Sequence, residues 1–158
     1  MKVKKVFNNN ILCAIDEEGN EVIVTGKGLG FQKHTGETLD KSKIEKTYRM
    51  VDKQEQRKLR ELVEQIPEDL QLTEQLVADI KRSIAQPLNE SLLITLTDHI
   101  SFAMQRKQQG IAFTNPLAGS IMCYYPAEYQ MGRRCLETIR QKTGIALNDD
   151  EASFIALH

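Results

Sequence analysis

The sequence predicts an α+β protein of two domains, an N-terminal four-stranded antiparallel β-sheet followed by an all-α helical bundle. Residues 1–51 alternate short apolar runs with turn residues at a period of two. From about Asp52 the apolar period becomes 3.6, and no further strand is expected. This change of period places the domain limits at 1–55 and 56–158.

Four short strands are expected in the first domain, at 3–7, 11–15, 21–25 and 44–51. Residues 16–20 have the composition of a hairpin turn, and Gly36 marks a loop before the last strand. A sheet of about 50 residues buries little apolar surface on its own. A partner sheet, and therefore a homodimer, is expected.

The first helices are predicted from apolar spacing and from start and stop residues. One helix spans 54–65 and stops before Pro67. Thr73 is a suitable N-cap for a second helix over 74–85. Asn89 begins a third helix that runs to about 109 and ends at Gly110.

The last third of the chain is also expected to be helical. Asn115-Pro116 begins a segment that runs to Gly144 with a break at Pro126. A final helix, 150–158, is capped by Asn148 or Asp149. Because this helix has barely two turns and no C-cap, we expect the chain to be a fragment of a longer protein.

Two turn motifs in the first domain offer the side chains that RNA recognition uses. Asn8-Asn9-Asn10 presents amide donors and acceptors for base edges, and segment 26–33 presents Phe31 for stacking beside lysines for phosphates. Taken alone, the asparagine triplet is better explained as a plain turn, and the glycine segment can be a hairpin turn with nothing bound, because Asn and Gly tolerate left-handed backbone. The net charge of −1 gives no support to nucleic-acid binding, but Lys5 and Lys27 lie beside the motifs.

Other functional classes find little support in the sequence. Segment 26–30 lacks the Gly-Lys-Ser/Thr ending of a phosphate-binding P-loop and does not lead into a helix. Cys13, Cys123 and Cys135 are too far apart for a metal or redox motif, so they are interpreted as free thiols. No cofactor, metal site or enzymatic activity is expected. With no apolar run near the ~18 residues of a membrane span and no signal peptide, a cytoplasmic location without membrane insertion is expected.

Two histidines lie among apolar residues of predicted helices, where a packed core role is the commoner explanation. His99 shares a helix face with Leu92 and Ala103, and His158 follows Phe154 and Ile155. Neither has a third ligand or a companion nucleophile nearby in the sequence. Each remains a potential phosphoryl acceptor, because an imidazole is partly nucleophilic near neutral pH.

Taken in order, these motifs resemble the BglG/SacY/LicT family of bacterial sugar-operon transcriptional antiterminators. The segments 5–10 and 26–33 are similar to the co-antiterminator RNA-binding domain of that family. The segments 96–100, 115–117, 124–126 and 150–158 are similar to its first phosphotransferase-system regulation domain, or PRD. The resemblance covers nearly the whole chain. The family normally carries a second PRD, so the resemblance also implies a C-terminally truncated first PRD.

The resemblance implies a dimeric protein that holds an RNA hairpin in a leader transcript and thereby prevents a terminator stem from forming. It places RNA contacts at seven positions: Lys5, Asn8, Asn10, Gly26, Lys27, Phe31 and Gln32. It makes His99 and His158 phosphorylation sites, with HPr and a sugar-specific enzyme II of the phosphotransferase system as phosphoryl donors. The alternative is a helical dimerisation or protein-interaction module that does not bind RNA.

Overall fold

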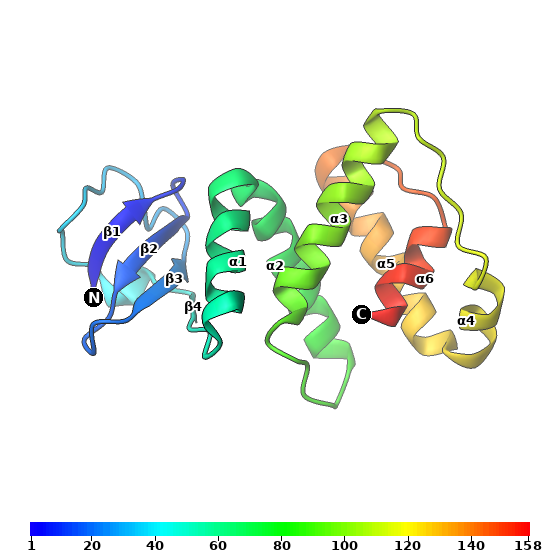
Figure 1. Cartoon of the computed structure of the whole chain (residues 1–158), viewed down its shortest axis with the longest axis horizontal. Helices are drawn as coiled ribbons and strands as arrows, with labels where there is room; N and C mark the ends of the chain where they lie inside the picture. The colour runs from blue at the N-terminus through cyan, green and yellow to red at the C-terminus, as the bar shows by residue number, and fades with distance from the viewer. The chain divides into compact units, whose positions relative to one another are not determined.

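A four-stranded antiparallel sheet in the order β1-β2-β3-β4 opens the chain (Figure 1). The strands are β1 (Lys2–Val6), β2 (Ile11–Ile15), β3 (Glu21–Thr25) and β4 (Lys46–Tyr48). All four expected strands are therefore confirmed, the first displaced by one residue and the last shorter. The computed structural model describes residues 1–158 and separates them into two units, Met1–Pro67 and Glu68–His158.

One face of the sheet packs against its own connections. Alternate residues of β1, β2 and β3 point to this face, as the two-residue period of a strand requires. Leu29, from the loop after β3, and Leu39, from the loop before β4, close the cluster. Its buried members are Val3, Leu12, Ala14, Val22, Val24, Leu29 and Leu39.

The opposite face is covered within the same unit by α1 (Lys53–Gln65). Ile11, Cys13 and Ile23 of this face are fully buried. Polar contacts tie the helix to the sheet, including Gln56 Nε2 donating to the carbonyl of Glu21 at 3.2 Å. The apolar face that favoured a partner sheet is thus already covered by a helix of the same chain, and this argument for a dimer is weakened.

Five helices form the second unit: α2 (Pro67–Ser83), α3 (Leu92–Gln108), α4 (Ala118–Tyr124), α5 (Pro126–Thr143) and α6 (Asp150–Leu157). The stripe expected on the third helix is buried, with Leu96 and Ile100 fully inaccessible. The break expected at Pro126 is confirmed, because α4 ends at Tyr124 and Pro126 begins α5. None of the helices combines the length and apolar character that crossing a bilayer requires.

The predicted start of the second helix at Glu74, with Thr73 as its N-cap, is wrong. Helix α2 begins seven residues earlier, at Pro67, with Glu68 and Asp69 in its first turn. Pro is favoured at the first position of a helix, where it has no N–H to leave unpaired. Thr73 lies buried inside the helix, and its hydroxyl donates to the carbonyl of Asp69 at 2.9 Å. Pro67 therefore ends one helix and starts the next.

The ends of the later helices follow their local sequence. Gly144 takes a left-handed conformation (φ 75°) as its N–H bonds the carbonyl of Arg140 and closes α5. Asn148, rather than Asp149, caps α6, because its Oδ1 accepts from the N–H of Asp150 at 2.8 Å. These caps fix the position of α6, which carries the residues discussed below.

Candidate nucleic-acid interface and histidine cluster

The asparagine turn and the glycine loop are joined into one surface at one end of the sheet. Oδ1 of Asn10 accepts the N–H of Gly28 at 2.8 Å, and the carbonyl of Asn10 accepts the N–H of Gly26 at 2.9 Å. A third bond runs from the N–H of Gly30 to the carbonyl of Asn9 at 2.8 Å. Two segments nearly twenty residues apart thus form a single rigid element.

Asn8 has a structural task in this element. Its Oδ1 accepts from the backbone N–H groups of Asn10 and Ile11, both at 2.8 Å. This is the local turn bond that asparagine side chains favour. The oxygen of Asn8 is therefore used within the turn, and only its amide hydrogens remain to meet a ligand.

Gly26 and Gly30 are required because the chain approaches itself closely. A Cβ at Gly26 would lie 1.9 Å from the carbonyl oxygen of Lys43, and one at Gly30 would lie 2.4 Å from that of Asn8. Gly28 instead supplies a left-handed turn, with φ 66°. The glycine pattern predicted close backbone approach, and the partner at Gly26 and Gly30 is the protein's own backbone.

Leu29 anchors the loop and leaves its neighbours outside. Leu29 is buried in the sheet core, whereas Phe31 keeps 58% of its surface exposed. The next residue, Gln32, has a positive φ of 53°, which is uncommon for a residue with a side chain. Exposed Lys27 donates its backbone N–H to the carboxylate of Glu45 at 3.3 Å. The loop therefore presents a ring, an amide and an ammonium group around a fixed backbone.

Lys5 is held away from this arrangement by α1. Its ammonium lies 2.8 Å from Oε1 of Glu64 and 5.5 Å from the ring centroid of Phe7. The hydrogen bond from Lys5 lowers the pKa of the Glu64 carboxyl below its usual value. Of the seven expected contact residues, the loops join Asn8, Asn10, Gly26 and Lys27 to Phe31 and Gln32, while Lys5 has a competing partner.

The two histidines lie side by side in the second unit. Their ring centroids, on α3 and at the end of α6, are 5.2 Å apart, and His99 also stacks near Phe154 at 5.4 Å. His158 is exposed, and its Nδ1–H donates to the carbonyl of Phe154 at 2.8 Å. Because a carbonyl only accepts, neutral His158 carries its lone pair on Nε2.

His99 contacts a buried carboxylate that the sequence did not reveal as its partner. Its Nε2 lies 2.9 Å from Oε2 of Glu151, and Arg106 Nη2 lies 2.6 Å from the other oxygen of the same carboxylate. The sequence does indicate that His99 and Arg106 share a helix face, because they are seven residues apart. Nothing in the sequence paired that face with Glu151.

Asn115 positions the helix that carries Glu151. Its backbone N–H bonds the carboxylate of Asp150 at 2.8 Å, and its Nδ2 bonds Oγ of Ser153 at 2.7 Å. Oδ1 of Asn115 also accepts from the N–H of Leu117. The Asn-Pro motif therefore joins the start of α4 to the first turn of α6.

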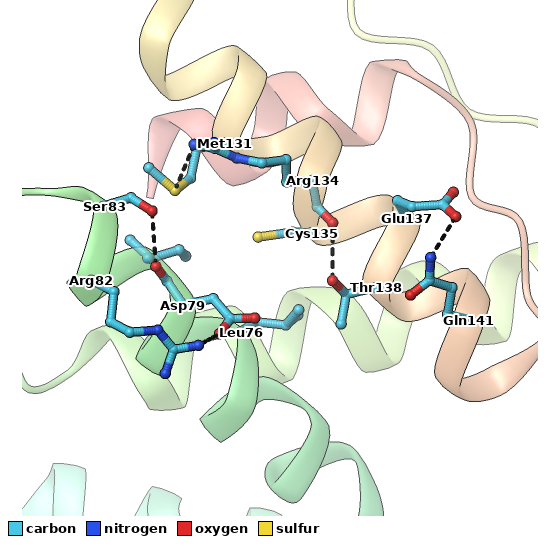
Figure 2. Close-up of a pocket in the computed structure, with 11 residues that line it drawn as sticks. Leu76, Asp79, Arg82, Ser83, Met131, Arg134, Cys135, Glu137, Thr138 and Gln141 are labelled. Carbon is cyan, nitrogen blue, oxygen red and sulfur yellow. Dashed lines mark hydrogen bonds and ion pairs between the residues drawn. The ribbon is translucent and has the colours of Figure 1, made fainter.

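A groove of about 420 Å³ is lined by residues of α2 and α5 (Figure 2). Cys135 is one of these residues, and burial raises the pKa of its thiol to about 11. The charged side chains of the rim are engaged within their own helices, as in the ion pair between Arg82 and Asp79. No set of polar groups converges in the groove, so it does not have the arrangement of a catalytic site.

Comparison with known proteins identifies both units. A model described as the CAT RNA binding domain matches residues 1–57, and the PRD domain model matches residues 74–158. The chain is 39% identical over 159 residues to the transcription antiterminator LicT of Bacillus subtilis (strain 168), covering 100% of the chain and 57% of LicT. It is 37% identical over 159 residues to the beta-glucoside operon antiterminator of Dickeya chrysanthemi, covering 100% of the chain and 56% of that protein. The chain thus spans just over half the length of these relatives.

A solved structure supports the same fold. The crystal structure of GlcT CAT-PRDI superposes with a TM-score of 0.84 at 37% sequence identity, covering 99% of this chain and 94% of that one. The expected architecture, an antiparallel sheet followed by a helical bundle, is confirmed.

Proposed function

The chain belongs to the family of transcription antiterminators that combine a CAT RNA-binding domain with a PRD, and from this premise we propose that it binds an RNA hairpin in a leader transcript. By holding that hairpin it would prevent an overlapping terminator from forming. The relatives that support this proposal are regulators named as antiterminators. The domain limits 1–55 and 56–158 and the cytoplasmic location belong to the same proposal.

The observation that carries the proposal is the joined surface of the asparagine turn and the glycine loop. It combines amide groups, exposed Phe31 and Lys27 on a backbone that internal hydrogen bonds hold in place. Unpaired bases of a looped hairpin are recognised by stacking and by hydrogen bonds to their edges, whereas a continuous A-form duplex keeps its bases stacked on one another and its major groove too deep and narrow for side chains to read. The target is therefore a hairpin with internal loops.

We further propose that HPr and a sugar-specific enzyme II phosphorylate His99 and His158, and that the chain is a homodimer. A phosphoryl group adds negative charge and three strong acceptors beside packed helices, which is how phosphorylation changes helix packing elsewhere. Two sheets held by a dimer would present a two-fold RNA surface, so loosening the dimer would weaken RNA binding without altering the contacts themselves.

The test is a binding titration of the chain with a looped hairpin and with a fully paired control RNA. We expect tight binding to the looped RNA only, and a loss of about 1–3 kcal/mol for Phe31→Ala. Val51→Ala is the matched control, because Val51 is an apolar side chain of the same unit that is 95% exposed. Equal binding of both RNAs, or a Phe31 variant as strong as the parent, would contradict the proposed surface.

The alternative function, a protein-interaction module, has its own support in the second unit. Large apolar side chains around α4 are exposed: Leu117, Met122, Tyr124 and Tyr125. If this reading holds, the chain self-associates but binds neither RNA. The same titration, combined with light scattering, separates the two functions.

A further inference from the structure

One carboxylate in the second unit is shared by an imidazole and a guanidinium of another helix. Glu151 on α6 gives Oε2 to Nε2 of His99 and Oε1 to Nη2 of Arg106, both on α3. Its side chain is only 6% exposed, and those of His99 and Arg106 are 18% and 13% exposed. A charge so deeply buried is stable only while it is paired. Glu151 therefore depends on both partners.

Arg106 is fixed in place and is not fully used. Its guanidinium lies 4.1 Å from the ring centroid of Phe113 and 4.9 Å from that of Phe102. Its Nε is buried and donates no hydrogen bond. A guanidinium presents its N–H groups as a planar fork, which suits an anion with two or more acceptor oxygens in reach. Glu151 satisfies only one branch of that fork.

From this geometry we propose that Arg106 is the binding residue for a phosphoryl group on Nε2 of His99, and that Glu151 occupies its place in the unphosphorylated protein. The inference rests on the proposed phosphorylation of His99 and adds the residues that receive the phosphate. Nε2 is the ring nitrogen farther from the backbone, and it is the one directed at the anion that Arg106 holds. A phosphoryl group there takes the position of Oε2.

The covalent step is a simple transfer between imidazoles. The bond between phosphorus and the donor nitrogen breaks, and its electron pair stays on the donor. Nε2 of His99 first gives up its proton. The lone pair left on Nε2 forms the new bond to phosphorus, and the donor nitrogen takes up one proton. Nothing is oxidised or reduced. Afterwards Nε2 has no proton to share with Glu151.

The product places a phosphoryl dianion where a carboxylate stood, so the two anions repel each other in a site of low dielectric. Arg106 stays with the stronger acceptor, because charge-assisted bonds to phosphate can use both branches of its fork. Glu151 must move. A cavity of about 160 Å³ beside the pair, lined in part by Lys107, gives its carboxylate room and a cationic neighbour.

This exchange loosens the contact between two helices. Glu151 is the ionic connection from α6 to α3, next to the stacked rings of His99 and His158. When the carboxylate leaves, α6 retains its contacts with α4 and α5 but loses its charged connection to α3. Phosphorylation of His99 thereby weakens the attachment of α6 to α3.

The experiment compares three substitutions in a His158→Gln background, which leaves His99 as the acceptor under study. Arg106→Gln removes the fork, Arg106→Lys keeps the charge and the apolar stem, and Glu151→Gln removes the competing charge. Arg140→Gln is the matched control, because Arg140 pairs with Glu137 on the surface of the same unit. Circular dichroism verifies the fold of each variant.

The equilibrium fraction phosphorylated by HPr, enzyme I and phosphoenolpyruvate is measured by intact mass at alkaline pH. We expect Arg106→Gln to lower the equilibrium constant about tenfold, the value of one charge-assisted hydrogen bond, and Arg106→Lys to recover part of it. Glu151→Gln is expected to raise it. If the ion pair between Arg106 and Glu151 were purely structural, removing either partner would change the equilibrium constant in the same direction. Opposite changes in the two variants therefore indicate the proposed exchange.

Phosphorus NMR on protein phosphorylated with phosphoramidate gives a second readout that needs no protein donor. A guanidinium beside the phosphoryl group lowers the pH midpoint of its resonance, so Arg106→Gln is expected to raise that midpoint by about half a unit or more. An unchanged midpoint and equilibrium in Arg106→Gln, or phosphate found on Nδ1, overturns this inference while the proposed regulation stands. If neither donor phosphorylates His99, the proposed regulation and this inference both fail.

Discussion

The side chains of Asn8 and Asn10 use their oxygens within the protein and leave their amide hydrogens for a ligand. Oδ1 of Asn10 holds the N–H of Gly28, and Oδ1 of Asn8 holds two backbone N–H groups of its own turn. An oxygen engaged in this way is not free for a base edge, so recognition falls to the amide hydrogens. The same side chain thus shapes the loop and presents the donor.

This division predicts that Asn10→Asp separates folding from binding. The aspartate keeps an oxygen for Gly28, so the melting temperature should stay close to that of the parent. It replaces the amide hydrogens with a negative charge, so affinity for the looped hairpin should fall by about 1–3 kcal/mol or more. Calorimetry and an RNA titration measure the two effects. Asn20→Asp, the same charge change in another turn of the sheet, serves as control and should bind nearly as well as the parent.

The three thiols are expected to differ in reactivity. Burial raises the pKa of both the Cys13 and Cys135 thiols, the latter to about 11, whereas Cys123 is exposed. Only the thiolate reacts with an alkylating reagent, so at pH 8 the two buried thiols should remain protonated and protected. Mass spectrometry after brief alkylation should find one modified cysteine in the native chain and three in denaturant. Rapid labelling of Cys135 in the native chain would contradict its burial.

At the scale of single residues, the sequence indicated which loop residues lie together but not all of their contacts. The asparagine turn and the glycine loop are joined by hydrogen bonds, as their turn residues and lysines on both sides of a short hairpin suggested. Their contacts with RNA stay a prediction. The sequence did not predict the contact between His99 and Glu151, because these residues lie 52 positions apart and on different helices. A seven-residue spacing shows which side chains share a face, but it does not show what that face contacts.

Among the elements, α1 has two roles that its sequence suggests only in part. Its apolar stripe, with Leu59 and Val63 fully buried, was predicted from spacing. Its cover over the second face of the sheet was not predicted, because the helix directly follows the last strand and no pattern shows which way it turns. As a result, the charged edge of α1 holds Lys5, an expected RNA contact.

Releasing Lys5 from α1 should strengthen RNA binding. Glu64→Gln removes the negative charge that pairs with Lys5. Affinity for the looped hairpin should therefore rise by about two- to fivefold at low salt. Glu61→Gln removes an equal charge from the same helix, where Glu61 pairs with Arg57 instead. Titrations at two salt concentrations compare the variants. If both raise affinity equally, the effect belongs to net charge and not to Lys5.

The start of α2 shows how two local rules compete within one element. Thr73 has the side chain of an N-cap and Pro67 commonly ends a helix, so the sequence predicts a helix start at the first and a helix end at the second. In the structure Pro67 serves as a first helical residue, and two acidic residues follow it in the first turn. Both positions obey ordinary helix chemistry, and only the surrounding structure decides which rule applies.

For the whole molecule, the two-unit architecture followed from a single observation, the change of apolar period near Asp52. The described units divide after Pro67, because α1 packs with the sheet that precedes it. Limited proteolysis would locate the boundary in solution.

The apolar pattern of the sequence did not determine the oligomeric state, because the sheet face that favoured a partner sheet is covered by α1 of the same chain. The proposed homodimer therefore depends on family membership and on the two-fold RNA site it implies.

The assembly is tested by mass in solution with and without RNA. Sedimentation at micromolar concentration is expected to give about twice the mass of one chain, and saturation with the looped hairpin should leave two chains per RNA, as a two-fold site requires. Dilution toward the monomer should weaken binding, because the second sheet then has to be recruited from solution. A chain that stays monomeric and still binds one hairpin tightly would show that a single sheet suffices. Phosphorylation would then have to act on RNA binding through the unit that carries His99, and not through the separation of two protomers.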